Sequence, residues 1–191
     1  MSKIGLREVK LINWYGFINE NIPLSENMTL ITGENESGKS TILDAIKYAY
    51  TGDYKFNEAT SKNNTGTGKR NLVSYTRCLL DPSAGIYARP ADKMPSVFTH
   101  IALEYYDEIN QNSFVLGVVL ETAAADIKTS EWYAAEKKTL KDLDFTYEEK
   151  GQEKPYDASD LQKKNGLKLK NKKDGITLFM QMTGLKLSYQ E

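Results

Sequence analysis

The pattern of apolar and polar positions predicts strands in the first part of the chain. Residues 4–13 interleave apolar side chains with charged ones, which is typical of a strand. Residues 14–17 form an aromatic turn, and residues 18–24 predict a shorter second strand that ends near Pro23. The compact apolar run at residues 28–32 is bounded by turn-forming residues and predicts a buried strand.

The spacing of apolar residues then becomes helical. Ile42, Ile46 and Ala49 fall on one face of a helix predicted over residues 41–50, and Gly52 is a helix stop. The pattern therefore predicts a strand, a glycine-bearing loop and a helix in direct succession.

The remaining chain predicts an antiparallel pair followed by shorter elements. Two strong strands at residues 97–106 and 113–121, joined by residues 107–112, predict a β-hairpin. The weaker expectations are a polar mobile loop at 57–69, a short helix within 70–80, an irregular stretch at 81–96, short strands at 131–135 and 143–147, and short helices at 157–164 and 176–182. We expect an α/β fold that carries an antiparallel β-subdomain.

Composition narrows the class of protein. A chain of 191 residues with 40% hydrophobic and 27% charged residues suits one domain with a packed core. No stretch approaches the roughly 20 apolar residues of a membrane span, so we expect a cytoplasmic location without a membrane partner. The net charge of −1 requires any DNA contact to come from a local patch. Cys78 is the only cysteine, which excludes an intramolecular disulfide.

The loop after residues 28–32 carries the clearest chemical signal. Residues 33–40, Gly-Glu-Asn-Glu-Ser-Gly-Lys-Ser, match the pattern G-x-x-x-x-G-K-[ST] at every fixed position. Gly33 and Gly38 allow the backbone to bend and its N–H groups to cradle phosphate oxygens at the start of a helix. The alternative is a glycine turn that caps an ordinary helix, and the predicted strand before and helix after the loop favour the phosphate-binding interpretation.

Each polar residue of this loop has an expected role. Lys39 reaches the β- and γ-phosphates, the Ser40 hydroxyl is a ligand of Mg²⁺, and Thr41 lies on the α-phosphate side. The candidate nucleotide-binding residues of the loop are Gly33, Asn35, Glu36, Ser37, Gly38, Lys39, Ser40 and Thr41. The expected ligands are ATP and Mg²⁺.

The loop and its surroundings resemble the ABC-type ATPase heads of the SMC superfamily and its RecF- and RecN-like relatives. Those heads open with a strand, an "N-F-x-x-F"-like turn, a short second strand and the P-loop, and residues 13–17 stand in the place of that turn. The segments 41–46, 72–77 and 99–108 are similar to JetC, the MukB-like ATPase family of Wadjet plasmid-defence condensins. Glu36 departs from the glycine usual in SMC proteins, and the string N-E-S-G-K-S-T also occurs in OLD-like nucleases, so that family stays open.

The resemblance implies an N-terminal head lobe of a three-layer α/β P-loop NTPase. It places this lobe at residues 1–150 and makes residues 151–191 a lysine-rich segment that leads toward a coiled coil absent from this chain. Such heads receive the signature motif and the Walker B acids from a C-terminal lobe. No Ser-Gly-Gly string is present, and the apolar run at residues 115–121 lacks the aspartate of Walker B, so we interpret it as a hairpin strand. We therefore assign no catalytic residue and expect ATP hydrolysis in the full-length protein, with little in this fragment.

The resemblance also implies partners and a function. The partners are the missing C-terminal lobe, a second copy of the head, kleisin-type and other condensin subunits, and double-stranded DNA. ATP-driven head pairing and hydrolysis would power DNA translocation or loop extrusion in anti-plasmid defence. The alternatives are a RecF- or OLD-like ATPase in DNA repair or phage defence, and a nucleotide-regulated binding module without turnover. Six lysines either contact DNA phosphates or form a solvated basic stretch, namely Lys163, Lys164, Lys168, Lys170, Lys172 and Lys173.

Three residues before the loop lie where the family places contacts to the base or ribose. These are Asn13, Trp14 and Tyr15, for which packing of an aromatic turn is the alternative.

Other candidates lie farther along the chain. In the family an arginine near Arg70 or Arg77 reaches nucleotide phosphates or the paired head, and an ordinary surface or capping arginine is the alternative. Gln181 is a candidate for the Q-loop glutamine that joins Mg²⁺ coordination, with a plain surface glutamine as the alternative. His100, the only histidine, is interpreted as structural.

Overall fold

A five-stranded sheet forms the centre of the molecule in the computed structural model, which describes residues 4–25, 29–33, 38–53 and 71–185. The sheet is antiparallel throughout, with the strand order β2-β1-β5-β6-β7. Its strands are β1 (Ile4–Trp14), β2 (Phe17–Pro23), β5 (Ser96–Asp107), β6 (Asn112–Ala123) and β7 (Asp126–Glu136). The two N-terminal strands and the long hairpin predicted from the sequence are confirmed.

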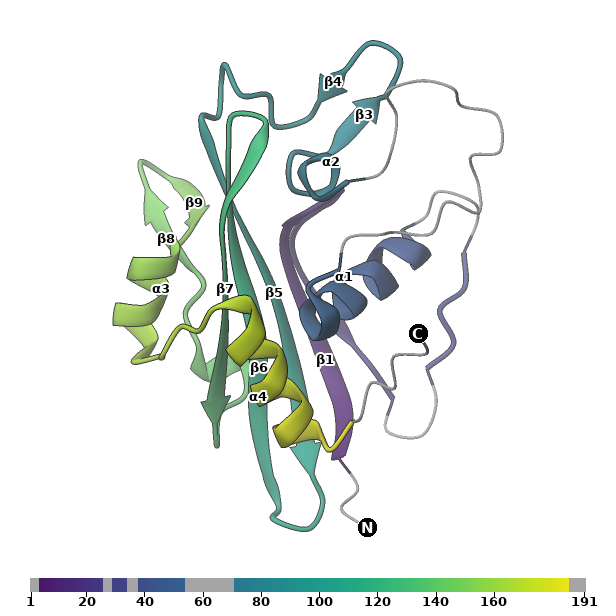
Figure 1. Cartoon of the computed structure of the whole chain (residues 1–191), viewed down its shortest axis with the longest axis vertical. Helices are drawn as coiled ribbons and strands as arrows, with labels where there is room; N and C mark the ends of the chain where they lie inside the picture. Colours follow the sequence, from purple (N-terminus) through teal and green to yellow (C-terminus); the bar gives the residue numbers. More distant parts are fainter. Residues whose placement is uncertain (1–3, 26–28, 34–37, 54–70, 186–191) are drawn as a thin grey trace.

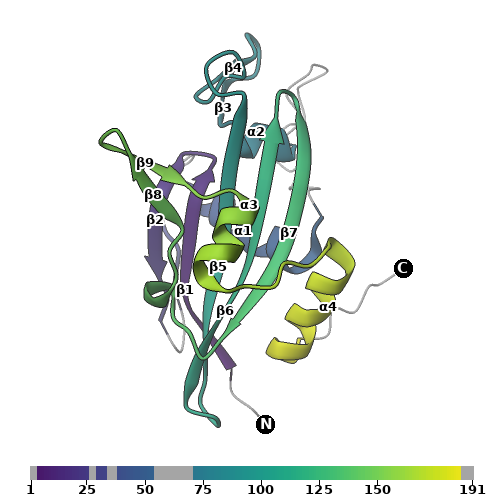
Figure 2. The same ribbon diagram turned by 90° about the vertical axis from the view of Figure 1, so that its left-hand side faces the viewer.

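Smaller elements cover both faces of this sheet, which gives three layers (Figure 1). Figure 2 shows the strands of the sheet side by side. One face carries α1 (Lys39–Thr51), α2 (Leu72–Thr76) and α4 (Lys172–Thr183). The other carries α3 (Ala158–Asn165), the short 3-10 helix η1 (Leu140–Asp142) and the hairpin β8 (Thr146–Glu149)–β9 (Gln152–Pro155). A second small hairpin joins β3 (Leu79–Asp81) to β4 (Ile86–Tyr87). The α/β architecture with an antiparallel subdomain is confirmed.

Strand β6 is apolar at successive positions because it is buried on both faces. Leu116, Val118 and Leu120 pack in the core beneath α1, whereas Val115 and Val119 pack in the core beneath α3. The apolar run at residues 115–121 is therefore a central hairpin strand, as predicted from the sequence, and its likeness to Walker B is superficial.

The buried strand predicted at residues 28–32 is wrong. The described residues 29–33 form no strand, and the Leu30 side chain is 77% exposed. A run of apolar residues becomes a buried strand only when a neighbouring strand pairs with it and a layer covers it. The sheet described here ends at β2 and β7 and offers this segment no such partner.

The shorter elements follow the sequence expectations with local differences. The helix within residues 70–80 is α2, and the two C-terminal helices are α3 and α4. The stretch at 81–96 is not wholly irregular, because β3 and β4 pair within it. The predicted strand at 143–147 begins only at Thr146, since Leu143 and Phe145 are buried in the core beneath α3. The loop expected at residues 57–69 lies outside the described residues.

The segment after residue 150 packs on both faces of the sheet. Leu161 of α3 and Phe179 of α4 are each 0% exposed, and each joins a different core cluster. Between the two helices, Lys170 and Trp132 exchange two backbone hydrogen bonds of 2.8 Å. The boundary at residue 150 stays a prediction. None of the helices in the described residues is long and apolar enough to cross a membrane.

Candidate nucleotide-binding site

The site is built on the N-terminus of α1. Gly38 caps this helix in the left-handed conformation, with φ 90° and ψ 4°. A Cβ at this position would lie 3.2 Å from Cζ of Phe17, so the ring of the aromatic turn crowds any residue larger than glycine. The first turn of α1 contains no acidic residue. The positive end of the helix dipole is therefore not offset by a carboxylate in the first turn, which favours an anion there.

The two ends of the predicted loop meet through Lys39. Its Nζ donates a 2.6 Å hydrogen bond to the carbonyl oxygen of Gly33, so the ammonium group lies across the loop. Ser40 is exposed in the first turn of α1, whereas Thr41 is 6% exposed. Gly33 and Lys39 are thus brought together, and Ser40 follows in the first turn of α1. Asn35, Glu36 and Ser37 lie outside the described residues, and the ligand contacts of the whole loop stay predictions.

Trp14 does not face a ligand, and its predicted contact with the base or ribose is wrong. The side chain is 0% exposed, and its indole Nε1–H donates a 2.9 Å hydrogen bond to the carbonyl oxygen of Thr41. The ring packs 4.8 Å from that of Tyr75. Packing of the aromatic turn, which was the alternative from the sequence, describes Trp14 correctly.

Asn13 is also engaged within the protein. Its Nδ2 donates a 3.0 Å hydrogen bond to the carbonyl oxygen of Phe98, and its Oδ1 accepts one of 3.1 Å from Nε of Arg89. Both ends of the amide are therefore used, and its predicted ribose contact is not supported. Tyr15 is half-buried, and its ring lies 5.7 Å from that of Tyr75.

Arg77 is a buried residue at the C-cap of α2, so the capping alternative describes its position and the predicted contact with nucleotide is not supported. Its side chain is 2% exposed, so it is neither a surface arginine nor a group that can reach nucleotide. The guanidinium donates to four backbone carbonyl oxygens, at Arg89 (2.8 Å), Met94 (3.0 Å), Pro95 (3.1 Å) and Thr122 (3.4 Å). Desolvation by burial lowers the pKa of Arg77 from its usual value of 12.5. Arg70 lies outside the described residues.

Arg89, a residue not predicted from the sequence, holds the aromatic turn in place. Arg89 is 7% exposed, and its Nη2 donates a 2.9 Å hydrogen bond to the carbonyl oxygen of Tyr15. Its Nη1 donates to the carbonyl oxygen of Thr76 at 3.1 Å. No local pattern marks this residue, because its partners lie 13 and 74 positions away.

A second missed contact joins α2 to α1. The Tyr75 hydroxyl donates a 2.5 Å hydrogen bond to Oδ2 of Asp44, which is 7% exposed on the buried side of α1. Asp44 is therefore committed to holding the helix. The only signal in the sequence is a carboxylate on the apolar face of an amphipathic helix.

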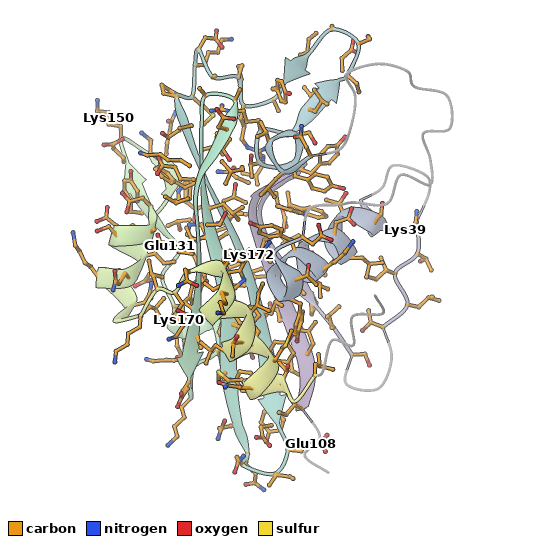
Figure 3. The ribbon with its side chains drawn as sticks, viewed as in Figure 1. Lys39, Glu108, Glu131, Lys150, Lys170 and Lys172 are labelled. Atoms are coloured by element: carbon orange, nitrogen blue, oxygen red, sulfur yellow. The ribbon has the colours of Figure 1, made fainter. Side chains whose placement is uncertain are left out.

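The structure does not bring Gln181 to Ser40. Gln181 is exposed on α4, which contacts α1 at the end farthest from the loop. There Lys172 Nζ donates a 2.7 Å hydrogen bond to the carbonyl oxygen of Gly52, and Phe179 packs edge-on against Tyr50 at 6.0 Å. Figure 3 shows Lys39 and Lys172 at opposite ends of α1. The predicted Mg²⁺ contact of Gln181 is not supported by this arrangement.

Comparison with known proteins identifies the same region. Residues 6–63 match the family described as the P-loop containing region of AAA domain. The match includes both glycines of the loop, Lys39, Ser40 and all of α1. This local match agrees with the phosphate-binding loop predicted from the sequence.

Similarity to individual proteins is local. The DNA replication and repair protein RecF of Brucella abortus (strain 2308) and that of Brucella suis biovar 1 (strain 1330) are each 31% identical to this chain over 51 residues. The alignment covers 27% of this chain and 13% of the length of RecF. A solved structure described for ATP-driven dimerization and DNA-stimulated activation of SMC ATPases aligns with a TM-score of 0.42 and 20% identity, over 71% of this chain and 72% of that chain.

Proposed function

We propose that this chain binds ATP with Mg²⁺ at residues 33–40 and serves as the N-terminal lobe of an SMC-like ATPase head. The observation that carries the proposal is the helix N-terminus capped by the left-handed Gly38, with Lys39 and Ser40 in the first turn and no acidic residue there. Triphosphate is the ligand that satisfies this charge pattern. The family match at residues 6–63 supports the same ligand class.

Magnesium is expected to bind together with the nucleotide. The described residues contain no group of three His, Cys, Asp or Glu side chains placed to hold a metal ion. The Ser40 hydroxyl and phosphate oxygens of the nucleotide are the hard oxygen ligands that Mg²⁺ prefers. We therefore expect Mg²⁺ to increase ATP affinity and to bind weakly without ATP.

Hydrolysis requires groups beyond this lobe. Asp44, the buried carboxylate of α1, is held by Tyr75 and is not positioned as a base for water. Phosphoryl transfer needs a positioned base and charge stabilisation from several directions. We propose that a C-terminal lobe and a second copy of the head supply these groups, so that ATP binding drives head pairing. In the full-length protein this cycle would power DNA translocation or loop extrusion, in a JetC-like role with kleisin-type subunits in plasmid defence.

The lysines of residues 163–173 are the proposed DNA contacts, and the structure ranks them. Lys163 lies 4.0 Å from Asp160, Lys164 lies 3.6 Å from Asp144, and Lys172 is bonded to Gly52. A carboxylate thus partly offsets the charge of Lys163 and of Lys164, and the hydrogen bond of Lys172 directs its ammonium group toward α1.

Lys168 and Lys173 are exposed and are therefore our first candidates for DNA contacts. Replacing both with alanine should weaken DNA binding and lower the dependence of log affinity on log salt by about 2. An unchanged salt slope would remove them from the interface.

The test of the proposed function is ATP turnover by the full-length protein, with and without double-stranded DNA. Lys39→Ala should abolish turnover, and the control Lys47→Ala, an exposed lysine on the same helix, should preserve it. ATP-dependent dimerisation, measured by light scattering, should be lost in the same variant. ATP binding without turnover would favour a nucleotide-regulated binding module, and ATP-dependent nuclease activity would favour an OLD-like protein.

A further inference from the structure

Both tryptophans of the chain donate a hydrogen bond to a backbone carbonyl of α1. Trp14 of β1 donates to Thr41 at 2.9 Å, and Trp132 of β7 donates to Ala49 at 2.8 Å. The two indoles are each 0% exposed. The chain has two tryptophans, so every tryptophan in it is bonded to the helix that follows the phosphate loop.

The two bonds hold opposite ends of α1. Thr41 lies in the first turn and Ala49 in the last, about 12 Å apart along the axis at 1.5 Å per residue. The strands that carry the two indoles are separated in the sheet by β5 and β6, which corresponds to about 14 Å. Helix α1 therefore crosses the sheet from β1 to β7 and is bound to a strand at each end.

The ring of Tyr48 connects the two anchor points. Its centroid lies 6.2 Å from that of Trp14 and 5.9 Å from that of Trp132. The Tyr48 hydroxyl also donates a 3.1 Å hydrogen bond to Oγ of Ser130 on β7. Three aromatic rings thus form a continuous row beneath the helix, and we call Trp14, Tyr48 and Trp132 the aromatic row.

The two indole bonds differ in kind. The Thr41 carbonyl lies inside the helix and has an intrahelical partner by α-helix geometry, so the Trp14 bond is an additional directional contact. The Ala49 carbonyl belongs to the last turn, where carbonyls lack an intrahelical partner. Trp132 satisfies that carbonyl, and its Cβ would lie 2.1 Å from a Cβ placed on Gly175, so α4 closes tightly over the same indole.

We propose that Trp14 and Trp132 are positioning residues for the nucleotide, since together they fix the place of α1 on the sheet. This inference rests on the proposed ATP binding. Gly38, Lys39 and Ser40 begin α1, so a shift of this helix moves the groups aimed at the phosphates and at Mg²⁺. Binding constellations lose affinity when their groups move by more than about 0.5 Å. Neither tryptophan touches the ligand in this account, and Trp132 acts from the far end of the helix.

The experiment compares Trp14→Phe and Trp132→Phe with wild type in the whole chain, by calorimetric titration with Mg²⁺–ATP and with ADP. Each variant keeps an aromatic ring and loses the indole N–H. We expect ATP affinity to fall about tenfold, which corresponds to the loss of roughly one hydrogen bond to a charged phosphate oxygen. ADP affinity should fall less, because ADP lacks the γ-phosphate and so loses only the β-phosphate part of the Lys39 contact. Tyr48→Phe, which removes only a hydroxyl, is the milder variant and should change the ATP-to-ADP ratio in the same direction.

The control is Val119→Ala, which lowers stability from the opposite face of the sheet, where Val119 is 1% exposed. All titrations are made well below the unfolding midpoint of every variant, so that loss of folded protein does not imitate loss of affinity. An ATP-to-ADP affinity ratio that stays at the wild-type value in both tryptophan variants would overturn the inference, as would an equal change in the control. Wild-type protein that binds no ATP would instead refute the proposed function, and the inference with it.

Hydrogen exchange of α1 amides without nucleotide gives a readout independent of ATP. The positioning role predicts faster exchange in α1 of both tryptophan variants than in Val119→Ala at matched stability. Equal exchange in the three variants would show that the aromatic row only adds to the core.

Discussion

The stability of this protein should depend on pH through its single histidine. His100 is 0% exposed in the core beneath α3, and its Nε2 lies 2.8 Å from the carbonyl oxygen of Tyr156. Its ring packs edge-on against Phe145 with centroids 5.8 Å apart. The pKa of His100 is lowered from 6.5 to about 4, mainly because burial desolvates the charged ring; the hydrogen bond to Tyr156 opposes this shift and the charge of Lys10 adds to it. His100 is therefore neutral at pH 7 and donates from Nε2.

The sign and size of the effect follow from the two pKa values. The folded pKa is lower than the unfolded one, so between about pH 6.5 and pH 4 the unfolded chain binds a proton that the folded protein does not. The contribution to stability is complete above pH 6.5 and is lost as the pH falls toward 4. At 1.36 kcal/mol per pKa unit the full loss is about 3 kcal/mol, and about 2 kcal/mol of it is lost between pH 8 and pH 5.

Urea unfolding at pH 5, 6, 7 and 8 measures this loss directly. His100→Gln keeps a side-chain donor for the Tyr156 carbonyl and does not titrate, so it serves as the control. Wild type should lose about 2 kcal/mol more than this variant between pH 8 and pH 5. If the stabilities of the two proteins change in parallel with pH, burial does not hold His100 neutral.

Three further substitutions test particular contacts. Gly38→Ala places an L-residue in the left-handed region and a Cβ 3.2 Å from the Phe17 ring, so thermal melting should show a loss of about 1–2 kcal/mol, and titration should show loss of ATP binding. Gly117→Ala puts a Cβ 2.2 Å from Cζ of Tyr133, so the free energy of unfolding measured in urea should fall by about 1–3 kcal/mol. The control Gly16→Ala, whose Cβ would have no atom within 4 Å, should lose far less stability. In Arg77→Lys the ammonium group cannot bond to all four carbonyl oxygens, so the free energy of unfolding should fall by about 3 kcal/mol. ATP affinity measured below the melting point should stay at the wild-type value, and a large loss of affinity would show that Arg77 belongs to the nucleotide site.

Features that depend on neighbours in sequence were predictable. The Gly38 cap, the helix after it and its stop at Gly52 are local, because capping and apolar spacing act within a few residues. The β5–β6 hairpin was predictable for the same reason, since a short turn joins two strands that pair along their whole length.

Features that depend on distant partners were not predictable. Leu30 stands in a run that reads as a buried strand, yet burial needs a partner strand that no local pattern supplies. Arg77 reaches the Thr122 carbonyl 45 positions away, and Trp14 reaches Thr41 across 27 positions. The sequence shows only that Trp14 precedes the phosphate loop and that Arg77 follows it. Only the fold shows whether that side chain faces the ligand or the core.

Binding of Mg²⁺–ATP to this chain is the most direct test of the central claim. Calorimetric titration should show saturable binding by wild type at one site. Lys39→Ala, which removes the ammonium group that lies across the loop, should weaken binding about 100-fold or more, since a charge-assisted contact to phosphate is worth about 3 kcal/mol. The control Lys47→Ala removes the same charge from an exposed position on α1 and should bind like wild type. Wild type that binds no ATP, or Lys39→Ala that binds ATP as tightly as wild type, would contradict the assignment of residues 33–40 as the nucleotide site.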